Sequence, residues 1–318
     1  MTGHCKLCGA NSPLILSHII PKFVVKWFKK TSATGYFRSF KTGKRVQEIH
    51  RLYLLCADCE QRLGRDEKRF AERIFVPYLT SPQPKSFDYD EWLLKFLVGL
   101  HWRILVAHQH PFPDNVREIF AGAEERWRKY LLEQAPDPGT SEFHVQFTDV
   151  IDRSTFKVPD KMNWYLARST DGTPIHNKSG DAGVFVKFPR LITLSFVTPR
   201  DPEKEDWRGT QIMARGTINV KQEITTTYVG EFLLGRARMI DVAPEMMTQR
   251  QKRKVFDDAR KNPEKILDSD SFRVHQADRN MRITQSVPVT IVLKGRDRNK
   301  PCPCGSGFKA KKCCGKWM

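Results

Sequence analysis

The sequence predicts an α+β fold with a cysteine-rich module at each end of the chain. All eight cysteines fall in two clusters, within residues 5–59 and 302–314. Segments with helical periodicity follow the first cluster, and short runs rich in β-branched and aromatic residues follow those. We therefore expect an N-terminal module, a helical segment, a mainly-β body that includes a basic helix, and a short tail, over residues 1–76, 77–139, 140–293 and 294–318.

The distribution of charge indicates an anionic partner. The 318 residues carry a formal net charge of +18, with a sequence pI of about 9.6. Residues 1–75 hold 15 Lys and Arg against 6 Asp and Glu, and residues 291–318 hold 8 against 1, so the middle is close to neutral. Basic character of this kind is typical of nucleic-acid binding, and we expect DNA more than RNA.

Two Cys-x-x-Cys pairs enclose the N-terminal module. Cys5 and Cys8 form one pair, Cys56 and Cys59 form the other, and 47 residues separate them. A pair with this spacing sits on a tight turn that points both sulfurs at one place, and two pairs supply the tetrahedron that zinc prefers. The spacing predicts one structural zinc ion held by four thiolates, with the intervening segment folded as an insert.

The local patterns within this module predict alternating strands and helices. A short strand and a short helix precede a loop or hairpin, and the second cysteine turn then leads into a longer helix. These elements are expected at residues 13–16, 24–30, 31–42 and 59–75, respectively.

The cysteine pairs, the segment His18-Ile-Ile-Pro21 and the helix that follows Cys59 together resemble the four-cysteine branch of the HNH nucleases. That resemblance covers roughly residues 5–75. It implies a ββα-type treble clef, in which a β-hairpin and a helix grip a catalytic metal above a zinc knuckle. By the same resemblance His18 would be the general base that activates water, with Mg²⁺ or Mn²⁺ assisting. The implied activity is that of a divalent-metal-dependent phosphodiesterase.

Three positions depart from the family pattern. Ser17 stands where the family has Asp or His as a metal ligand, Glu60 stands where it has His, and Arg51 lies near the place of an expected asparagine. Glu is a good ligand for a hard cation, whereas Ser is a poor one. The structural alternatives are that His18 supports the zinc turn and that Glu60 complements the helix dipole.

Basic and aromatic residues alternate through the insert. This mixture suits phosphate contacts combined with base stacking, and the alternative is a solvated face over a small local core. The candidates for nucleic-acid contact are Lys22, Lys26, Lys29, Lys30, Arg38, Lys41, Lys44 and Arg45.

The middle of the chain holds no motif that points to chemistry. We expect helices over 88–108, 114–134 and 244–267, the last rich in Lys and Arg, and a final strand over 286–293. We interpret the tryptophans of the middle of the chain as core residues, and the histidines at 101, 108 and 110 as structural or solvated. The expected short strands are 143–147, 162–167, 184–188, 191–197, 210–214, 217–220 and 224–229.

The tail carries the densest motif of the sequence. Pro-Cys302-Pro-Cys304-Gly-Ser-Gly is followed by Lys-Cys313-Cys314-Gly, and this pattern resembles the SEC-C motif. The resemblance implies a second zinc ion, bound by Cys302, Cys304, Cys313 and Cys314, and a tail able to dock a protein partner. Phe308 and Ala310 depart from the usual order of the aromatic residues, which affects the partner-binding surface rather than the zinc ligands.

Two functions are consistent with this organisation. One is a zinc-dependent nucleic-acid-binding protein, with a divergent HNH-type endonuclease site, in a bacterial setting such as phage defence. The other is a non-enzymatic adaptor whose tail binds a chaperone or ribosome. The polar start of the chain and the lack of a long apolar run predict a cytoplasmic protein without a membrane span.

Overall fold

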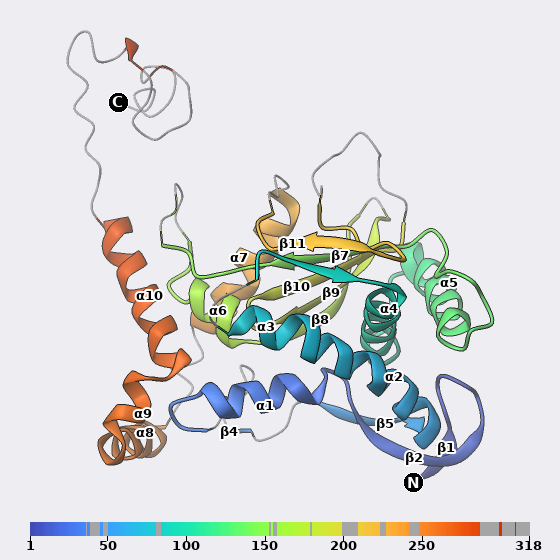
Figure 1. Ribbon diagram of the computed structural model, residues 1–318, viewed down its shortest axis with the longest axis horizontal. Coiled ribbons are helices and arrows are strands. Elements are labelled where there is room, and N and C mark those ends of the chain that lie inside the picture. The colour runs from blue at the N-terminus through green and yellow to red at the C-terminus, as the bar shows by residue number, and fades with distance from the viewer. Residues whose placement is uncertain are drawn as a thin grey trace.

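The computed structural model describes most of the chain. We discuss residues 1–35, 37–38, 45–46, 50–80, 84–152, 154, 158–178, 180–198, 209–222, 227–241, 248–286, 299–300 and 309. The C-terminal cysteines, Lys41, Lys44 and the side chains of Arg38 and Arg45 lie outside the described residues. In the described part, helices and sheets are both abundant, which confirms an α+β protein (Figure 1).

The N-terminal module is built on a three-stranded antiparallel sheet. Its strand order is β1-β2-β5, and α2 begins directly after β5. The segment between β2 and β5 holds α1 and a small hairpin of β3 and β4. The bounds are β1 (Thr2–His4), β2 (Asn11–His18), α1 (Lys22–Thr31), β3 (Phe37–Arg38), β4 (Arg45–Val46), β5 (Arg51–Cys56) and α2 (Ala57–Phe70).

A helical region follows, as the periodicity predicts. The chain continues from α2 through a short π-helical stretch, and α4 is buried almost all round. The Asp90 side chain caps α4 by accepting a hydrogen bond from the Trp92 backbone N–H at 3.2 Å. The bounds are η1 (Ala71–Phe75), α3 (Val76–Leu79), β6 (Ser86–Tyr89), α4 (Glu91–Val106) and α5 (Asp114–Leu131).

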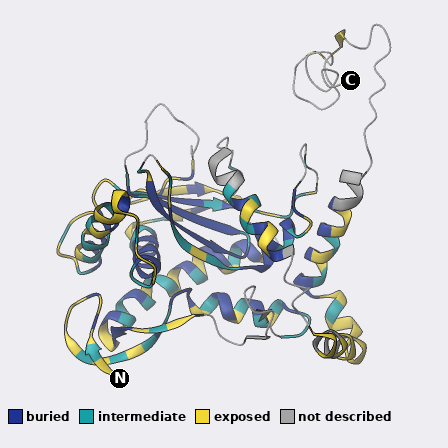
Figure 2. Cartoon of the chain, turned by 180° about the vertical axis from the view of Figure 1, so that it is seen from behind, coloured by how far each residue is buried: buried dark blue, intermediate teal, exposed yellow. Residues whose placement is uncertain are grey.

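A four-stranded antiparallel sheet forms the centre of the body. Its order is β7-β10-β9-β8, and every residue of β9 is buried because helices cover both faces (Figure 2). One face packs against the region of α2, α4 and α5, and the other packs against α6, α7 and α10. The strands are β7 (Glu142–Phe147), β8 (Asp171–His176), β9 (Ala182–Phe188) and β10 (Leu191–Phe196).

The expected strand over 162–167 is wrong, because this segment is the helix α6 (Met162–Arg168). The Asp278 carboxylate accepts hydrogen bonds from the backbone N–H groups of Asn163 and Trp164, at 2.8 and 3.1 Å. The first N–H groups of a helix have no acceptor within the helix, and Asp278 supplies an acceptor for two of them. Asp278 lies more than 110 residues away, in a helix that the sequence did not predict, α10 (Asp270–Ser286).

The remaining expectations for the body are met in part. β11 (Gly216–Asn219) pairs with β6 near the predicted 217–220, whereas 210–214 contributes only a single bridge, from Gln211 to His144. The described part of 224–229 begins α7 (Thr227–Asp241) instead of forming a strand.

The basic helix is divided at Pro263 into α8 (Gln249–Lys261) and α9 (Pro263–Leu267). Ser286 ends α10, and the rest of 286–293 lies outside the described residues.

One continuous hydrophobic core links the N-terminal module to the body. It includes Cys5 and Cys59 beside residues of α4, α5, β7, β9 and β11. Trp102 and Trp127 are fully buried in it, as expected for structural tryptophans. The sheet bearing the N-terminal cysteines therefore rests on the same core as the central sheet.

Candidate metal centre

The four N-terminal cysteines converge on one point. Their sulfur atoms all lie within 4.8 Å of one another, and the Sγ atoms of Cys8 and Cys56 are 3.8 Å apart. A tetrahedral zinc ion with Zn–S bonds of about 2.3 Å separates its sulfurs by about 3.8 Å. The donor set and its geometry therefore fit a zinc ion, and the cluster could hold one.

Two backbone turns create this convergence. In the first, the Gly9 N–H donates to the Cys5 carbonyl at 2.8 Å, and Gly9 has a φ of 79°, which glycine adopts without strain. The second pair starts at the end of β5: Cys56 is the N-cap of α2, and Cys59 lies in the first turn of that helix. The partial positive charge at a helix start favours thiolates there.

The thiols differ in acidity in the absence of a bound cation. Burial raises the pKa of Cys5, but hydrogen bonds from nearby backbone N–H groups, first that of Cys8, outweigh it and bring the pKa to about 7. Burial raises the pKa of Cys8 and of Cys59. A bound dication would lower the pKa of all four thiols, because thiols ionise when they become ligands.

Ser17 and Glu60 meet beside the cysteine cluster. The Ser17 hydroxyl donates to the Glu60 carboxylate at 2.7 Å, and Ser17 is fully buried while Glu60 is half-buried. Ser17 lies near the end of β2 and Glu60 follows Cys59 in α2. The two positions that the HNH resemblance assigns to metal ligands are thus in direct contact, although they are 43 positions apart in the sequence.

His18 follows at the last position of β2. Its side chain is half-buried, and its strand partner in β5 is the exposed Arg51. The His18 carbonyl accepts a hydrogen bond from the Arg103 Nη1 of α4 at 3.0 Å, and the Arg103 Nη2 lies 2.5 Å from the Glu67 Oε1 of α2. Arg103, which is 2% exposed, therefore ties the backbone of His18 to the helix that carries Glu60.

Sequence reasoning missed the part played by Arg103. The available signal was a single arginine in a mostly apolar helical segment, since a buried arginine must have an anionic or carbonyl partner. Nothing in the pattern indicated that the partner would be the strand bearing His18.

The described basic candidates form a row on α1. Lys22, Lys26 and Lys30 are exposed and follow one another at intervals of four residues, so they share one face of the helix, and Lys29 is half-buried. The α1 helix starts four residues after His18. The lysine row therefore begins close to the candidate site and leads away from it.

The histidines of the middle have structural surroundings. His101 is fully buried, and its Nε2 lies 2.8 Å from the Thr193 Oγ1. Burial, with a smaller effect of His144, lowers the pKa of His101 to about 3, so the ring is neutral at pH 7. His108 stacks on Phe112. Among the described residues, the only group of three or more His, Cys, Asp or Glu side chains placed to share a metal is the four-cysteine cluster.

Comparison with known proteins identifies one motif. Residues 298–316 match the SEC-C motif, in agreement with the resemblance seen in the tail. No described helix has the length and apolar character required to cross a membrane.

Two relatives share short stretches with the chain. The protein translocase subunit SecA of Azobacteroides pseudotrichonymphae is 33% identical over 98 residues, which cover 31% of this chain and 8% of that protein. The UPF0225 protein plu2503 of Photorhabdus laumondii is 42% identical over 53 residues, or 14% of this chain and 33% of that protein. The chain thus spans a third or less of either relative. No solved structure matches it.

Proposed function

We propose that the protein binds nucleic acid and that its N-terminal module is a divergent, divalent-metal-dependent endonuclease. The observation that carries the proposal is the contact of Ser17 with Glu60 at 2.7 Å, one residue away from both His18 and Cys59. The antiparallel pair β2–β5 followed by α2 supports it as well, because this order of elements is the one the HNH resemblance implies.

Each residue has a role in this proposal. Four thiolates hold a structural zinc ion that fixes the start of α2 against β2. Glu60 is the carboxylate that would hold Mg²⁺ or Mn²⁺, ions that commonly bind through one or two carboxylates together with substrate phosphate oxygens. When bound, such an ion stabilises the leaving oxygen of the phosphodiester. The Ser17 hydroxyl orients the Glu60 carboxylate, and His18 removes a proton from the attacking water.

The setting proposed for this activity is the cytoplasm of a bacterium, where phage defence is one suitable role. A reducing compartment suits eight cysteines that are all assigned to metal clusters. The second zinc ion is assigned to Cys302, Cys304, Cys313 and Cys314 of the SEC-C motif.

A cleavage assay tests the endonuclease proposal. We expect the wild type to cut plasmid DNA, and RNA more slowly, with Mg²⁺ or Mn²⁺ present. His18→Ala should lower the rate by about 10²-fold or more, the usual contribution of a general base. His176→Ala, which replaces an exposed histidine of β8, is the matched control and should cut as the wild type does.

Zinc content must be measured in parallel, so that lost activity is not mistaken for lost folding. Activity that is indifferent to His18→Ala, or a wild type that cuts neither substrate with either ion, would contradict the proposal. The adaptor function would then be favoured, since the SEC-C match does not depend on catalysis. In that case the N-terminal module is a scaffold and the tail docks a protein such as a chaperone or a ribosomal component.

A further inference from the structure

The basic helix α8 exposes an arginine-bearing face. Its 13 residues include six Lys and Arg against two Asp. All seven of its residues whose side chains are described are exposed, and Phe256, at 71%, is the most exposed of the described large apolar side chains in the body. These seven are Gln249, Arg250, Arg253, Phe256, Asp257, Arg260 and Lys261.

The seven described residues of α8 lie together on one side of the helix. At about 100° per residue they fall within an arc of about 140°, with Phe256 at one edge beside Arg260 and with Asp257 between Arg253 and Arg250. A face with four cations against one carboxylate, bordered by one aromatic ring, is poorly suited to packing against the body. It is well suited to contacts with phosphate oxygens, with an apolar contact at its edge.

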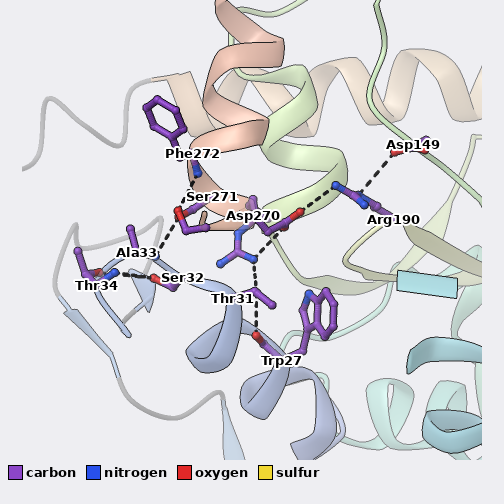
Figure 3. Close-up of polar contacts among 12 residues, drawn as sticks. Trp27, Thr31, Ser32, Ala33, Thr34, Asp149, Arg190, Asp270, Ser271 and Phe272 are labelled. Carbon is purple, nitrogen blue, oxygen red and sulfur yellow. Dashed lines mark hydrogen bonds and ion pairs between the residues drawn. The ribbon is translucent and has the colours of Figure 1, made fainter. Parts of the chain in front are cut away.

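The segment that carries α8 is fastened to the end of the lysine-bearing helix α1. The Ala33 backbone N–H donates to the Ser271 hydroxyl at 3.0 Å (Figure 3). Arg168 donates to the Thr31 hydroxyl at 2.6 Å and to the Asp270 carboxylate at 3.1 Å. Asp270 follows the end of α8 by only nine residues, and Figure 1 shows α8 beyond the C-terminal end of α1. The two basic helices therefore lie at the same end of the structure.

We propose that α8 binds double-stranded DNA by placing its arginine face in the major groove. This inference rests on the proposed nucleic-acid-binding function and extends it to a second contact, remote in sequence from His18. A helix of about 10–12 Å diameter fits the major groove of B-form DNA, which is about 12 Å wide. The major groove of duplex RNA is too narrow and deep for it. Arg250, Arg253 and Arg260 contact phosphates or base edges, and Phe256 packs against sugar or a base methyl group.

Binding of labelled 30-base-pair duplexes to the full-length protein tests this inference. Divalent ions are left out to prevent cleavage, and no chelator is added because it would remove zinc. We expect the triple variant Arg250→Gln, Arg253→Gln and Arg260→Gln to lose at least about 10-fold in affinity for DNA near 0.1 M salt. The slope of log K against log salt should become shallower by up to about 2.7, or 0.9 for each phosphate contact removed.

A charge-matched control lies on α5. Arg117→Gln, Arg126→Gln and Lys129→Gln remove three exposed cations at the opposite end of the structure, and DNA affinity should change less than about 2-fold. Equal losses in both triple variants would reduce the effect to net charge and overturn the inference. So would unchanged binding in the α8 variant, or duplex RNA binding with the same affinity and the same loss.

An acidic protein is the competing partner. Poly-glutamate that binds the wild type and not the α8 variant, while DNA binds both alike, would reject the DNA inference in its favour. These measurements need neither Mg²⁺ nor His18. A failed cleavage assay would thus leave the inference standing, and an α8 variant that binds DNA as tightly as the wild type does would leave the endonuclease proposal standing.

Discussion

Replacement of Cys59 by serine should release the N-terminal zinc ion and destabilise the part of residues 1–76 that surrounds the cysteines. Cys59 is 5% exposed and lies in the same buried cluster as Leu7 and Leu63, so a metal ion bound there would be part of the core around these residues. Structural zinc contributes about 10–16 kcal/mol to the folding of small modules. That contribution is comparable with or larger than the whole free energy of unfolding of a small domain. The serine oxygen is a weak substitute for a thiolate in a four-sulfur site.

Hydrogen exchange measured by mass spectrometry checks this outcome segment by segment. We expect protection to fall in β2, β5 and the first turn of α2 and to persist in β9 and β10, which form the centre of the body. Ala57→Ser is the matched control, since it places a serine in the same helical turn at an exposed position that is not a ligand. A Cys59→Ser protein with full protection of residues 1–76 would show that the cluster does not hold the module together.

Substitution of Asp270 by alanine should destabilise the protein by about 3–5 kcal/mol, the usual cost of leaving a buried charge without its partner. The Asp270 carboxylate lies 3.1 Å from the Arg168 Nη1 and 2.9 Å from the Arg190 Nη2. The side chains of Asp270 and Arg168 are only 6% and 4% exposed. Burial lowers the pKa of Arg168 and Asp270 opposes that effect, so the carboxylate supports the charged form.

Chemical denaturation of Asp270→Ala and Asp268→Ala measures the effect. Asp268 is an exposed aspartate two residues away, and its loss should change the free energy of unfolding by less than about 0.5 kcal/mol. Equal and small effects of both substitutions would mean that the carboxylate contributes little to stability. Because Asp270 starts α10, we also expect its loss to loosen the attachment of α8 and α9 to α1.

The sequence predicted the elements whose patterns are local. The Cys-x-x-Cys spacing identified the four residues that converge, and the continuous apolar run identified α4 as a buried helix. The alternation of β-branched and aromatic residues located β7, β9 and β10, because strands buried in a sheet need such residues whatever surrounds them.

Contacts between distant segments account for what the sequence did not predict. The helix α6 depends on Asp278 at its start, and α10 is a largely polar helix fastened by Asp270 and Asp278 to other elements. The contact of Ser17 with Glu60 was also hidden, even though both residues flank motif positions. The sequence showed separately that Ser17 and Glu60 each depart from the HNH pattern. Only the fold shows that these two side chains are in contact.

We expect cysteine-bound zinc to organise the protein, and elemental analysis of the purified chain measures this without reference to activity. We expect two zinc ions per wild-type chain. One ion should remain after Cys59→Ser, and one should remain after the combined change Cys302→Ser and Cys304→Ser in the tail. A wild-type protein that folds with no bound zinc, or a zinc content unaffected by Cys59→Ser, would contradict the claim.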